Sequence, residues 1–274
     1  MRKKKPVRTI TVASGKGGVG KTNVVANLGI ALRKMGKEVL ILDADLGLSN
    51  VDILLHLAPR FNIQHVLRGE KRLKDVIVEG PCGIKILPAS SGVQELTRLD
   101  ESQRMRLLEE FDAYDGDIDV LLVDTCAGIS ENVAFFCIAA QEIVIVTSPE
   151  PTALTDAYAL IKVLFTRYQE KEFRILVNSA RNEAEAMEVY RKLSIAADRF
   201  LNVSLDYLGY LPFDKSVHEA VRSQKAFIEM APMGSASRAV NELASRFIDQ
   251  SAESPKGTLQ FFLGNLFAMA AESK

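Results

Sequence analysis

The feature that most constrains this chain is a glycine-rich octet, GKGGVGKT, which runs from Gly15 to Thr22. It has the spacing G-x-x-x-x-G-K-[ST], with a β-branched run before it and a helical pattern of apolar residues after it. Such a loop turns successive backbone N–H groups toward phosphate oxygens, and the following helix adds the partial positive charge of its N-terminus. The octet therefore predicts a strand, a phosphate-binding loop and a helix in that order.

The loop contains two lysines with different expected roles. Lys21 is expected to contact the β- and γ-phosphates of a nucleotide, and the Thr22 hydroxyl to ligate magnesium. Lys16 follows the first glycine, and because Lys21 already serves the phosphates, Lys16 is free to cross an interface to the nucleotide of a second subunit. The other loop positions expected to contact the nucleotide are Gly15, Gly17, Gly18, Val19, Gly20 and Asn23.

The rest of the chain alternates short β-branched runs with helical patterns. This alternation predicts an α/β fold with a mostly parallel, twisted sheet of about seven to eight strands and helices on both faces. The last amphipathic helix is expected around residues 240–248, with Ser235 or Ser237 as its N-cap. The predicted strands are Val7 to Ala13, Glu38 to Asp43, Ile84 to Ala89, Asp119 to Asp124, Ile143 to Thr147, Phe173 to Asn178 and Tyr207 to Leu211.

The length of 274 residues favours one large domain over two. We expect a nucleotide-binding domain over residues 1–248, a linker over 249–257 and a C-terminal helix over 258–274. The formal net charge of -1 predicts no global attraction to nucleic acid. Three scattered cysteines, no signal-peptide pattern and no long apolar run favour a cytoplasmic protein that at most rests on a membrane.

Three acids end predicted strands on the side where the phosphate loop should lie. Asp43 and Asp45 are two apart, so on a strand both would point to one face, where one can serve the water shell of magnesium and the other can orient an attacking water. Asp124 ends an apolar strand, the usual place for an acid that binds magnesium through water. Gly128 follows in a small turn whose backbone N–H is placed to sense the γ-phosphate. A single acid often only caps a turn, but three beside one phosphate loop favour a catalytic site.

These motifs also carry a family resemblance. The octet with its early lysine resembles the deviant Walker A loop of the MinD/ParA ATPases. Nearly the whole chain is similar to the flagellar-number branch of that family, the FleN/FlhG proteins. The stretches that carry the similarity are GKGGVGKTNVVANL, LDADLGLSNVDILL, DTCAGIS, PEPTALTDAYALIK, RILVNSARNEAEA, LGYLPFDKSVHEAVRSQKAF and GTLQFFLGNLF.

The resemblance implies a slow, magnesium-dependent ATPase that dimerises when ATP binds. Two ATP molecules would lie face to face in the homodimer, with Lys16 of each chain reaching the phosphates bound to the other. By the same match Asp45 would position the water, while Asp43 and Asp124 would serve magnesium.

Further residues take roles from the same match. Asn178 would contact adenine, and Pro212 and Asp214 fall in the family's second base-contacting loop. Glu150 and Asp156 lie near its dimer interface. The implied partners are a FleQ-like enhancer-binding transcription factor, which the protein would restrain, and a FlhF-like flagellar GTPase at the cell pole.

Two departures from the family pattern stand out. Many relatives carry an activating motif at the N-terminus, whereas only MRKKKPVR precedes the first predicted strand, so direct stimulation of the GTPase is not expected. Cys126 stands in the DTxAGI turn where Gly or Ala is usual.

The C-terminal segment carries an apolar stripe at helical spacing. A helix of about 14 residues spans only ~21 Å, so it is too short to cross a bilayer and would lie in the interface. It resembles the membrane-targeting helix of MinD, and we expect it to alternate between docking on the protein and binding lipid as the ATP-bound dimer forms. The stripe consists of Leu259, Phe262, Leu263, Leu266 and Phe267.

Three other functions stay open at this point. A partition ATPase that binds nonspecific DNA would share the catalytic residues, but it needs a basic surface that the balanced charge does not indicate. An iron–sulfur carrier would need paired cysteines, and Cys126 has no evident partner. A nucleotide-gated binding module whose hydrolysis is incidental would use the same site as a switch.

Overall fold

The computed structural model describes residues 6–90, 98–249 and 260–262. It is built on an eight-stranded sheet in the order β3-β4-β2-β5-β1-β6-β7-β8, in which all neighbouring strands are parallel except the antiparallel pair β3 and β4. This confirms the α/β class expected from the alternating pattern. The strands are β1 (Arg8–Ser14), β2 (Val39–Ala44), β3 (Val78–Glu79), β4 (Lys85–Leu87), β5 (Val120–Ala127), β6 (Glu142–Thr147), β7 (Glu172–Ala180) and β8 (Ser204–Pro212).

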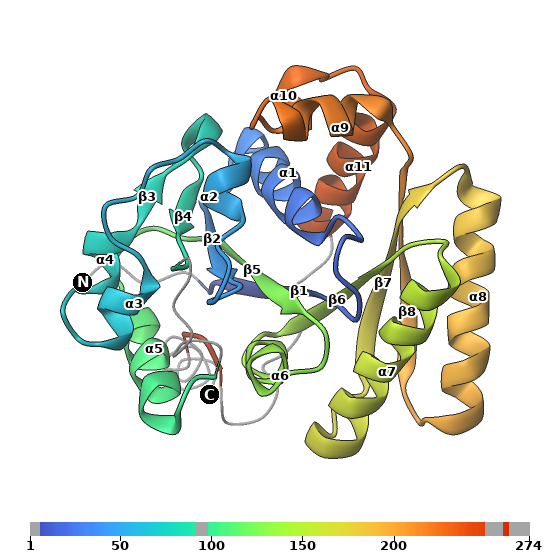
Figure 1. Ribbon diagram of the computed structural model, residues 1–274, viewed down its shortest axis with the longest axis horizontal. Helices are drawn as coiled ribbons and strands as arrows, with labels where there is room; N and C mark the ends of the chain where they lie inside the picture. Colours follow the sequence, from blue (N-terminus) through green and yellow to red (C-terminus); the bar gives the residue numbers. More distant parts are fainter. Residues whose placement is uncertain (1–5, 91–97, 250–259, 263–274) are drawn as a thin grey trace.

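Helices cover both faces of the sheet. On one face α1, α2, α10 and α11 pack over the strands, and Figure 1 shows α9 beside them. On the other face α3 to α8 form two adjoining cores. The helices are α1 (Lys21–Lys34), α2 (Val51–Leu54), α3 (Ile63–Leu67), α4 (Leu73–Val76), α5 (Glu101–Ala113), α6 (Glu131–Ile138), α7 (Pro151–Tyr168), α8 (Glu183–Phe200), α9 (Lys215–Arg222), α10 (Phe227–Met230) and α11 (Ser235–Asp249).

Two local features differ from the sequence-based expectations. The strand β3 has only two residues, too few for a periodic pattern to reveal it. The predicted N-cap of the last helix was wrong, because α11 already begins at Ser235. Its first turn is capped from a distance, since a carboxylate oxygen of Asp214 accepts the Ala236 N–H at 3.2 Å and the Ser235 hydroxyl at 2.8 Å. The Ser237 hydroxyl instead donates to the Ala231 carbonyl at 2.7 Å.

The sheet order positions the site. Because β1 lies between β5 and β6, and β2 lies next to β5, the carboxyl ends of β1, β2 and β5 meet at one edge of the sheet. In the register of β2 and β5, Asp43 lies opposite Asp124. The phosphate loop (residues 15–22) leaves β1 at the same edge and enters α1. The acids that the sequence placed at separate strand ends are therefore neighbours in space.

Candidate functional site

Close contacts with two other elements shape the phosphate loop. A Cβ on Gly15 would lie 2.1 Å from the carbonyl oxygen of Asp156 in α7, so only glycine fits there. A Cβ on Gly20 would lie 2.3 Å from Nδ2 of Asn178, and Gly20 has a φ of 87°, which favours glycine. Asn178 Nδ2 donates to the Val19 carbonyl oxygen at 2.7 Å. The loop is held between α7 and the end of β7.

Lys21, the first residue of α1, points into the buried interior. Its Nζ lies 2.5 Å from Oδ1 of Asp124 in β5, and the two side chains are 9% and 0% exposed. Solvent screens a buried pair of this kind only weakly. The expected phosphate-binding lysine is therefore held by the expected magnesium-binding acid.

Asp43 and Asp124 form a pair of buried carboxylates. Asp43 accepts the backbone N–H groups of Asn50 at 2.9 Å and Val51 at 3.1 Å. Burial, and next the neighbouring charge of Asp124, raise the pKa of Asp43 well above its ordinary value of 3.8. When both carboxylates are ionised, their negative charges repel each other, so a cation bound between them is favoured.

This donor set fits magnesium. Oδ2 of Asp124 is buried and has no hydrogen-bond partner among the described residues. Lys21 pairs with Asp124, and Asp43 lies opposite Asp124 in the next strand, so these three groups together have one uncompensated negative charge when both carboxylates are ionised. Magnesium usually binds one or two protein carboxylates and completes its shell with water and phosphate oxygens. In the described ranges no cluster of three or more His, Cys, Asp or Glu side chains is arranged to hold a metal.

Asp45 lies just beyond β2 and lines a cavity of about 460 Å³ with the phosphate loop. Asn50 Nδ2 donates to Oδ2 of Asp45 at 3.1 Å. Burial raises the pKa of Asp45, while the charge of Lys21 opposes this shift. The sequence placed Asp43 and Asp45 on one face of a strand. The structure gives them different surroundings because β2 ends at Ala44, so the alternation of strand side chains stops before Asp45.

Lys16 lies at the exposed rim of the phosphate loop. Its Nζ is 2.6 Å from Oε2 of Glu150 and 2.7 Å from Oγ1 of Thr152, at the start of α7. The side chains of Lys16 and Glu150 are 34% and 66% exposed. An exposed pair is typically worth about 1 kcal/mol or less, so Lys16 can exchange it for a stronger anion. Lys16, Glu150 and the backbone of Asp156 thus lie together beside the loop.

A smaller cavity of about 240 Å³ adjoins the phosphate loop, next to β7 and β8. Its lining includes Asn178, Pro212 and Asp214, the three residues expected near the base of a nucleotide, and it also includes Phe213 and His218. The structure brings these residues together with Gly18 to Gly20 at one opening. Their contact with a base stays a prediction.

Asp214 also has a structural role. One carboxylate oxygen accepts the N–H of Ser216 at 3.0 Å and its hydroxyl at 2.7 Å, which caps α9, and the other caps α11. These hydrogen bonds hold the pKa of Asp214 well below its ordinary value, and the bond from the Ser216 hydroxyl contributes most to this shift. Asp214 therefore joins the N-termini of two helices beside the smaller cavity.

The turn after β5 is tied to β1. Gly128 has a φ of 101°, and its N–H donates to the Ser14 carbonyl oxygen at 2.9 Å. The N–H that the sequence predicted to contact the γ-phosphate is therefore already hydrogen-bonded within the protein. Cys126 Sγ lies 3.8 Å from the Ser130 hydroxyl, and burial raises the pKa of the thiol. Nothing in the structure explains the choice of cysteine there.

Some residues of the site have no local signal in the sequence. Gln224 lines the larger cavity and donates to the Ile53 carbonyl oxygen at 3.0 Å, although 171 positions separate them. Thr152 bonds Lys16 from the first turn of α7. Asn50 was visible in the sequence only as part of the stretch that carries the family resemblance. Packing between distant elements brings Gln224 and Thr152 to the site, whereas Asn50 reaches Asp45 from only five residues along the chain.

The described part of the C-terminal segment docks on the protein itself. Phe261 and Phe262 are buried, and their rings lie 4.9 and 5.5 Å from the ring of Phe111 in α5. The Phe261 N–H donates to the Ala139 carbonyl oxygen at 3.0 Å. Leu259, Leu263, Leu266 and Phe267 lie outside the described residues. Among the described helices, none has the length and apolar character needed to cross a membrane.

The chain is similar over most of its length to known P-loop NTPases. The ParA family model, described as NUBPL iron-transfer P-loop NTPase, matches residues 5–248. The antiactivator FleN of Pseudomonas aeruginosa is 44% identical over 95% of this chain and 94% of its own length. The flagellum site-determining protein YlxH of Helicobacter pylori is 32% identical over 94% of this chain and 88% of its own. The structure of MinD with Mg-ADP from Pyrococcus horikoshii is 27% identical, with a TM-score of 0.71, over 88% of this chain and 96% of that one.

Proposed function

We propose that this chain, which belongs to the MinD/ParA family of P-loop NTPases and is a homologue of the antiactivator FleN, is an ATP-dependent dimerising switch that regulates flagellum number. The observation that carries the proposal is the cluster at the ends of β1, β2 and β5. There Lys21 pairs with Asp124, which lies opposite the buried Asp43, and Asp45 and Lys16 line the adjoining cavity.

We infer that the larger cavity holds the phosphates of ATP. Lys21 would exchange its bond to Asp124 for the β- and γ-phosphates, while the amide groups of residues 15–20 and the N-terminus of α1 neutralise further charge. Thr22 would hold magnesium directly, and Asp43 and Asp124 through water. Bound magnesium supplies positive charge to the phosphate oxygens.

Asp45 is the residue we assign to the attacking water. Its carboxylate lines the cavity beside the phosphate loop, where it can hold and orient a water molecule, and the bond from Asn50 to its Oδ2 fixes its position. The Asp45→Ala variant should bind ATP and hydrolyse it at least about a hundredfold more slowly, because positioned proton transfer contributes that much. A phosphate-release assay under saturating ATP measures this.

Lys16 is the residue we assign to the partner's nucleotide. Its exposed ion pair with Glu150 can be exchanged for phosphate charge across an interface, which supports a homodimer in the ATP state. Light scattering with ADP and with ATP tests this. We expect ATP to dimerise the wild type and Asp45→Ala, but not Lys16→Ala. A wild-type protein that stays monomeric with ATP would contradict the assignment of Lys16 to the partner's nucleotide.

The similarity to FleN and YlxH supports a role in flagellum regulation. The partners we propose are a FleQ-like enhancer-binding transcription factor and a FlhF-like GTPase. Restraint of the transcription factor should follow the dimer, so a flagellar reporter should stay repressed with Asp45→Ala and be released with Lys16→Ala. The opposite result for both variants would show that restraint depends on hydrolysis rather than on the dimer.

We also propose peripheral membrane contact by the C-terminal segment. The burial of Phe261 and Phe262 supports a docked state that dimerisation would release. Two weak anchors in one dimer would bind lipid far better than one. Deleting residues 258–274 should abolish ATP-dependent sedimentation with anionic liposomes and leave ATP binding intact. Unchanged sedimentation would refute membrane contact by this segment while leaving the ATPase assignment standing.

A further inference from the structure

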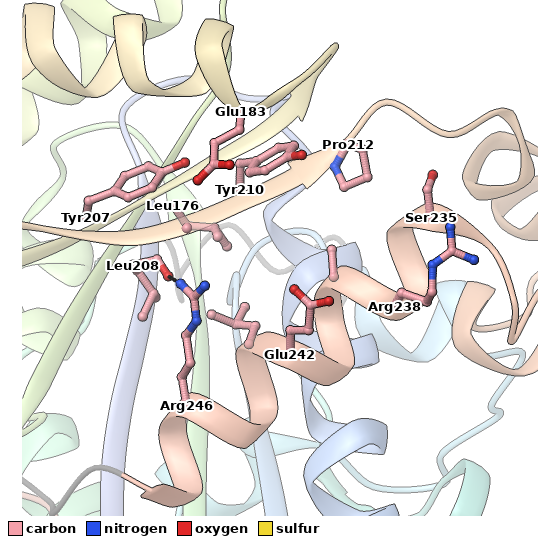
Figure 2. A pocket seen from close by; sticks show the side chains of 13 residues that line it. Leu176, Glu183, Tyr207, Leu208, Tyr210, Pro212, Ser235, Arg238, Glu242 and Arg246 are labelled. Atoms are coloured by element: carbon pink, nitrogen blue, oxygen red, sulfur yellow. Dashed lines mark hydrogen bonds between the residues drawn. The ribbon is translucent and has the colours of Figure 1, made fainter.

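A third cavity lies at the end of the sheet, between β8 and α11 (Figure 2). Its volume is about 390 Å³, and it shares only Pro212 with the two cavities at the phosphate loop. Leu176, Leu208 and Leu243 form an apolar floor. Figure 2 shows charged and aromatic side chains on both sides of β8, namely Glu183, Tyr207 and Tyr210 on one and Arg238, Glu242 and Arg246 on the other. We call this cavity the edge groove.

The groove exists because β8 is an edge strand with a bulge. Within the described ranges β8 pairs only with β7, and the register passes from Tyr207 to Gly209 and skips Leu208. The Leu208 carbonyl oxygen accepts from Nη1 of Arg246 at 2.7 Å. Gly209 has a φ of 138°, and a Cβ there would lie 3.1 Å from the same nitrogen. Arg246 thus occupies one backbone acceptor on the edge of β8, and the rest of the groove stays open.

The charged side chains of the groove form no ion pairs within the described part of the chain. None of Arg238, Glu242 and Arg246 forms a salt bridge with a described residue, although Arg238 donates to the Met233 carbonyl oxygen at 2.5 Å. Exposed charges on α8 do pair, as in the 2.7 Å contact of Lys192 with Glu188. The edge groove therefore presents, beside an open strand, a row of charges that no described residue pairs.

A tyrosine hydroxyl adds a second, independent observation. The hydroxyl of Tyr207 is shielded from solvent and has no hydrogen-bond partner among the described residues. A buried polar group without a partner costs about 1–3 kcal/mol by the usual estimate, so it favours an incoming donor or acceptor. Figure 2 shows it on the same side of β8 as Glu183.

The spacing of the charges identifies the shape of the ligand. Arg238, Glu242 and Arg246 follow one another at four-residue intervals, which is about 6 Å along a helix. Side chains on one face of an extended strand recur about every 6.6–6.8 Å. An extended segment lying along β8 would therefore meet each of these charges with every second side chain, and its other side chains would face Glu183 and Tyr207.

We propose that the edge groove docks an extended peptide segment of a partner protein, with an acidic, a basic and again an acidic residue at alternate positions. The acids would pair with Arg238 and Arg246 and the base with Glu242, while the segment adds to the open edge of β8. This surface adjoins the nucleotide site only at Pro212 and does not include the docked Phe261 and Phe262.

Labelled synthetic peptides test the proposal by fluorescence anisotropy at low ionic strength with the full-length protein. The probe is TVDTKTDVT, and the control TVKTDTKVT has the opposite charge order. We expect the wild type to bind the probe about tenfold more tightly, because three attractive pairs replace three repulsive ones. Equal binding of the two peptides, or binding of neither, would overturn the proposal.

Charge variants sharpen the test. Glu242→Lys should weaken binding of the probe and strengthen binding of the all-acidic peptide TVDTDTDVT. Arg191 is an exposed residue of α8 outside the groove, so Arg191→Glu should change neither affinity. Glu242 is exposed and has no partner in the described part, so the variant should keep its fold and its ATP binding. Hydrogen exchange gives a second readout, since the probe should slow exchange of the β8 amides. An affinity order that Glu242→Lys leaves unchanged would contradict the docking geometry.

Discussion

The centre of the sheet and its β8 edge differ in how their charged side chains are buried and paired. At the centre, Lys21 and Asp124 come from different elements and meet at 2.5 Å with almost no exposure. At the edge, Arg238, Glu242 and Arg246 come from one helix, remain exposed and form no ion pair with described residues. Burial makes an unpaired charge costly, whereas water supports an exposed one at little cost. Central charges therefore serve both the fold and the site, and edge charges are available to a partner.

The strongest way to test this comparison is to break the central ion pair. Lys21→Met keeps most of the side-chain volume but leaves Asp124 beside Asp43 without its cation. We expect the free energy of unfolding to fall by about 3–5 kcal/mol, and ATP binding to be lost. Denaturant unfolding at neutral pH measures the change.

The second lysine of the loop is the matched control. Lys16→Met removes an exposed pair with Glu150 and should cost less than about 1 kcal/mol. Equal losses for the two lysine variants would show that burial does not separate their roles.

A steric test of the centre comes next in size. Gly15→Ala would place a Cβ 2.1 Å from the Asp156 carbonyl oxygen, so the loop or α7 must shift, at a cost of about 1–3 kcal/mol. Gly17→Ala is the control, because no atom lies within 4 Å of a Cβ there. Thermal unfolding of both variants should separate them, and similar melting temperatures would mean that α7 does not confine the loop.

Asp214 lies between the two regions and should give an intermediate effect. Asp214→Ala removes the acceptor that caps α9 and α11 and should cost about 1–2 kcal/mol at neutral pH. The folded-state pKa of Asp214 is lowered, so its contribution is full above the ordinary value of 3.8 and is lost as the pH falls below it. The difference between wild type and variant should therefore shrink in acid. A difference that stays constant from pH 7 to strongly acidic pH would argue against capping by the carboxylate.

The smallest effect is expected at the edge. Glu242→Ala should change the free energy of unfolding by less than about 0.5 kcal/mol, because the carboxylate is exposed and has no ion-pair partner among the described residues. Urea unfolding of this variant beside Lys21→Met compares the two regions directly. A loss above about 1 kcal/mol would mean that the edge charges stabilise the fold and are not reserved for a ligand.

The fold class and the core of the site were predictable because their signals are local. The octet, the alternating β-branched runs and the acids at strand ends each occupy a few consecutive positions, and parallel strands bring their carboxyl ends to one edge. The same local logic failed for Ser235 and Ser237, since the cap of α11 comes from Asp214, about 20 residues earlier in the chain. It also missed the hydrogen bond from the Gly128 N–H to the Ser14 carbonyl oxygen, because that bond joins the turn after β5 to β1.

The sequence by itself determined that this chain has a phosphate loop on an α/β sheet, with acids beside it and a second lysine on its rim. Residue spacing along a strand or helix specifies such features directly. Only the tertiary structure decided that Lys21 pairs with Asp124, that Lys16 rests on Glu150, and that a bulge opens a groove beside α11. These contacts join residues far apart in the chain, and the packing of whole elements sets which of them meet.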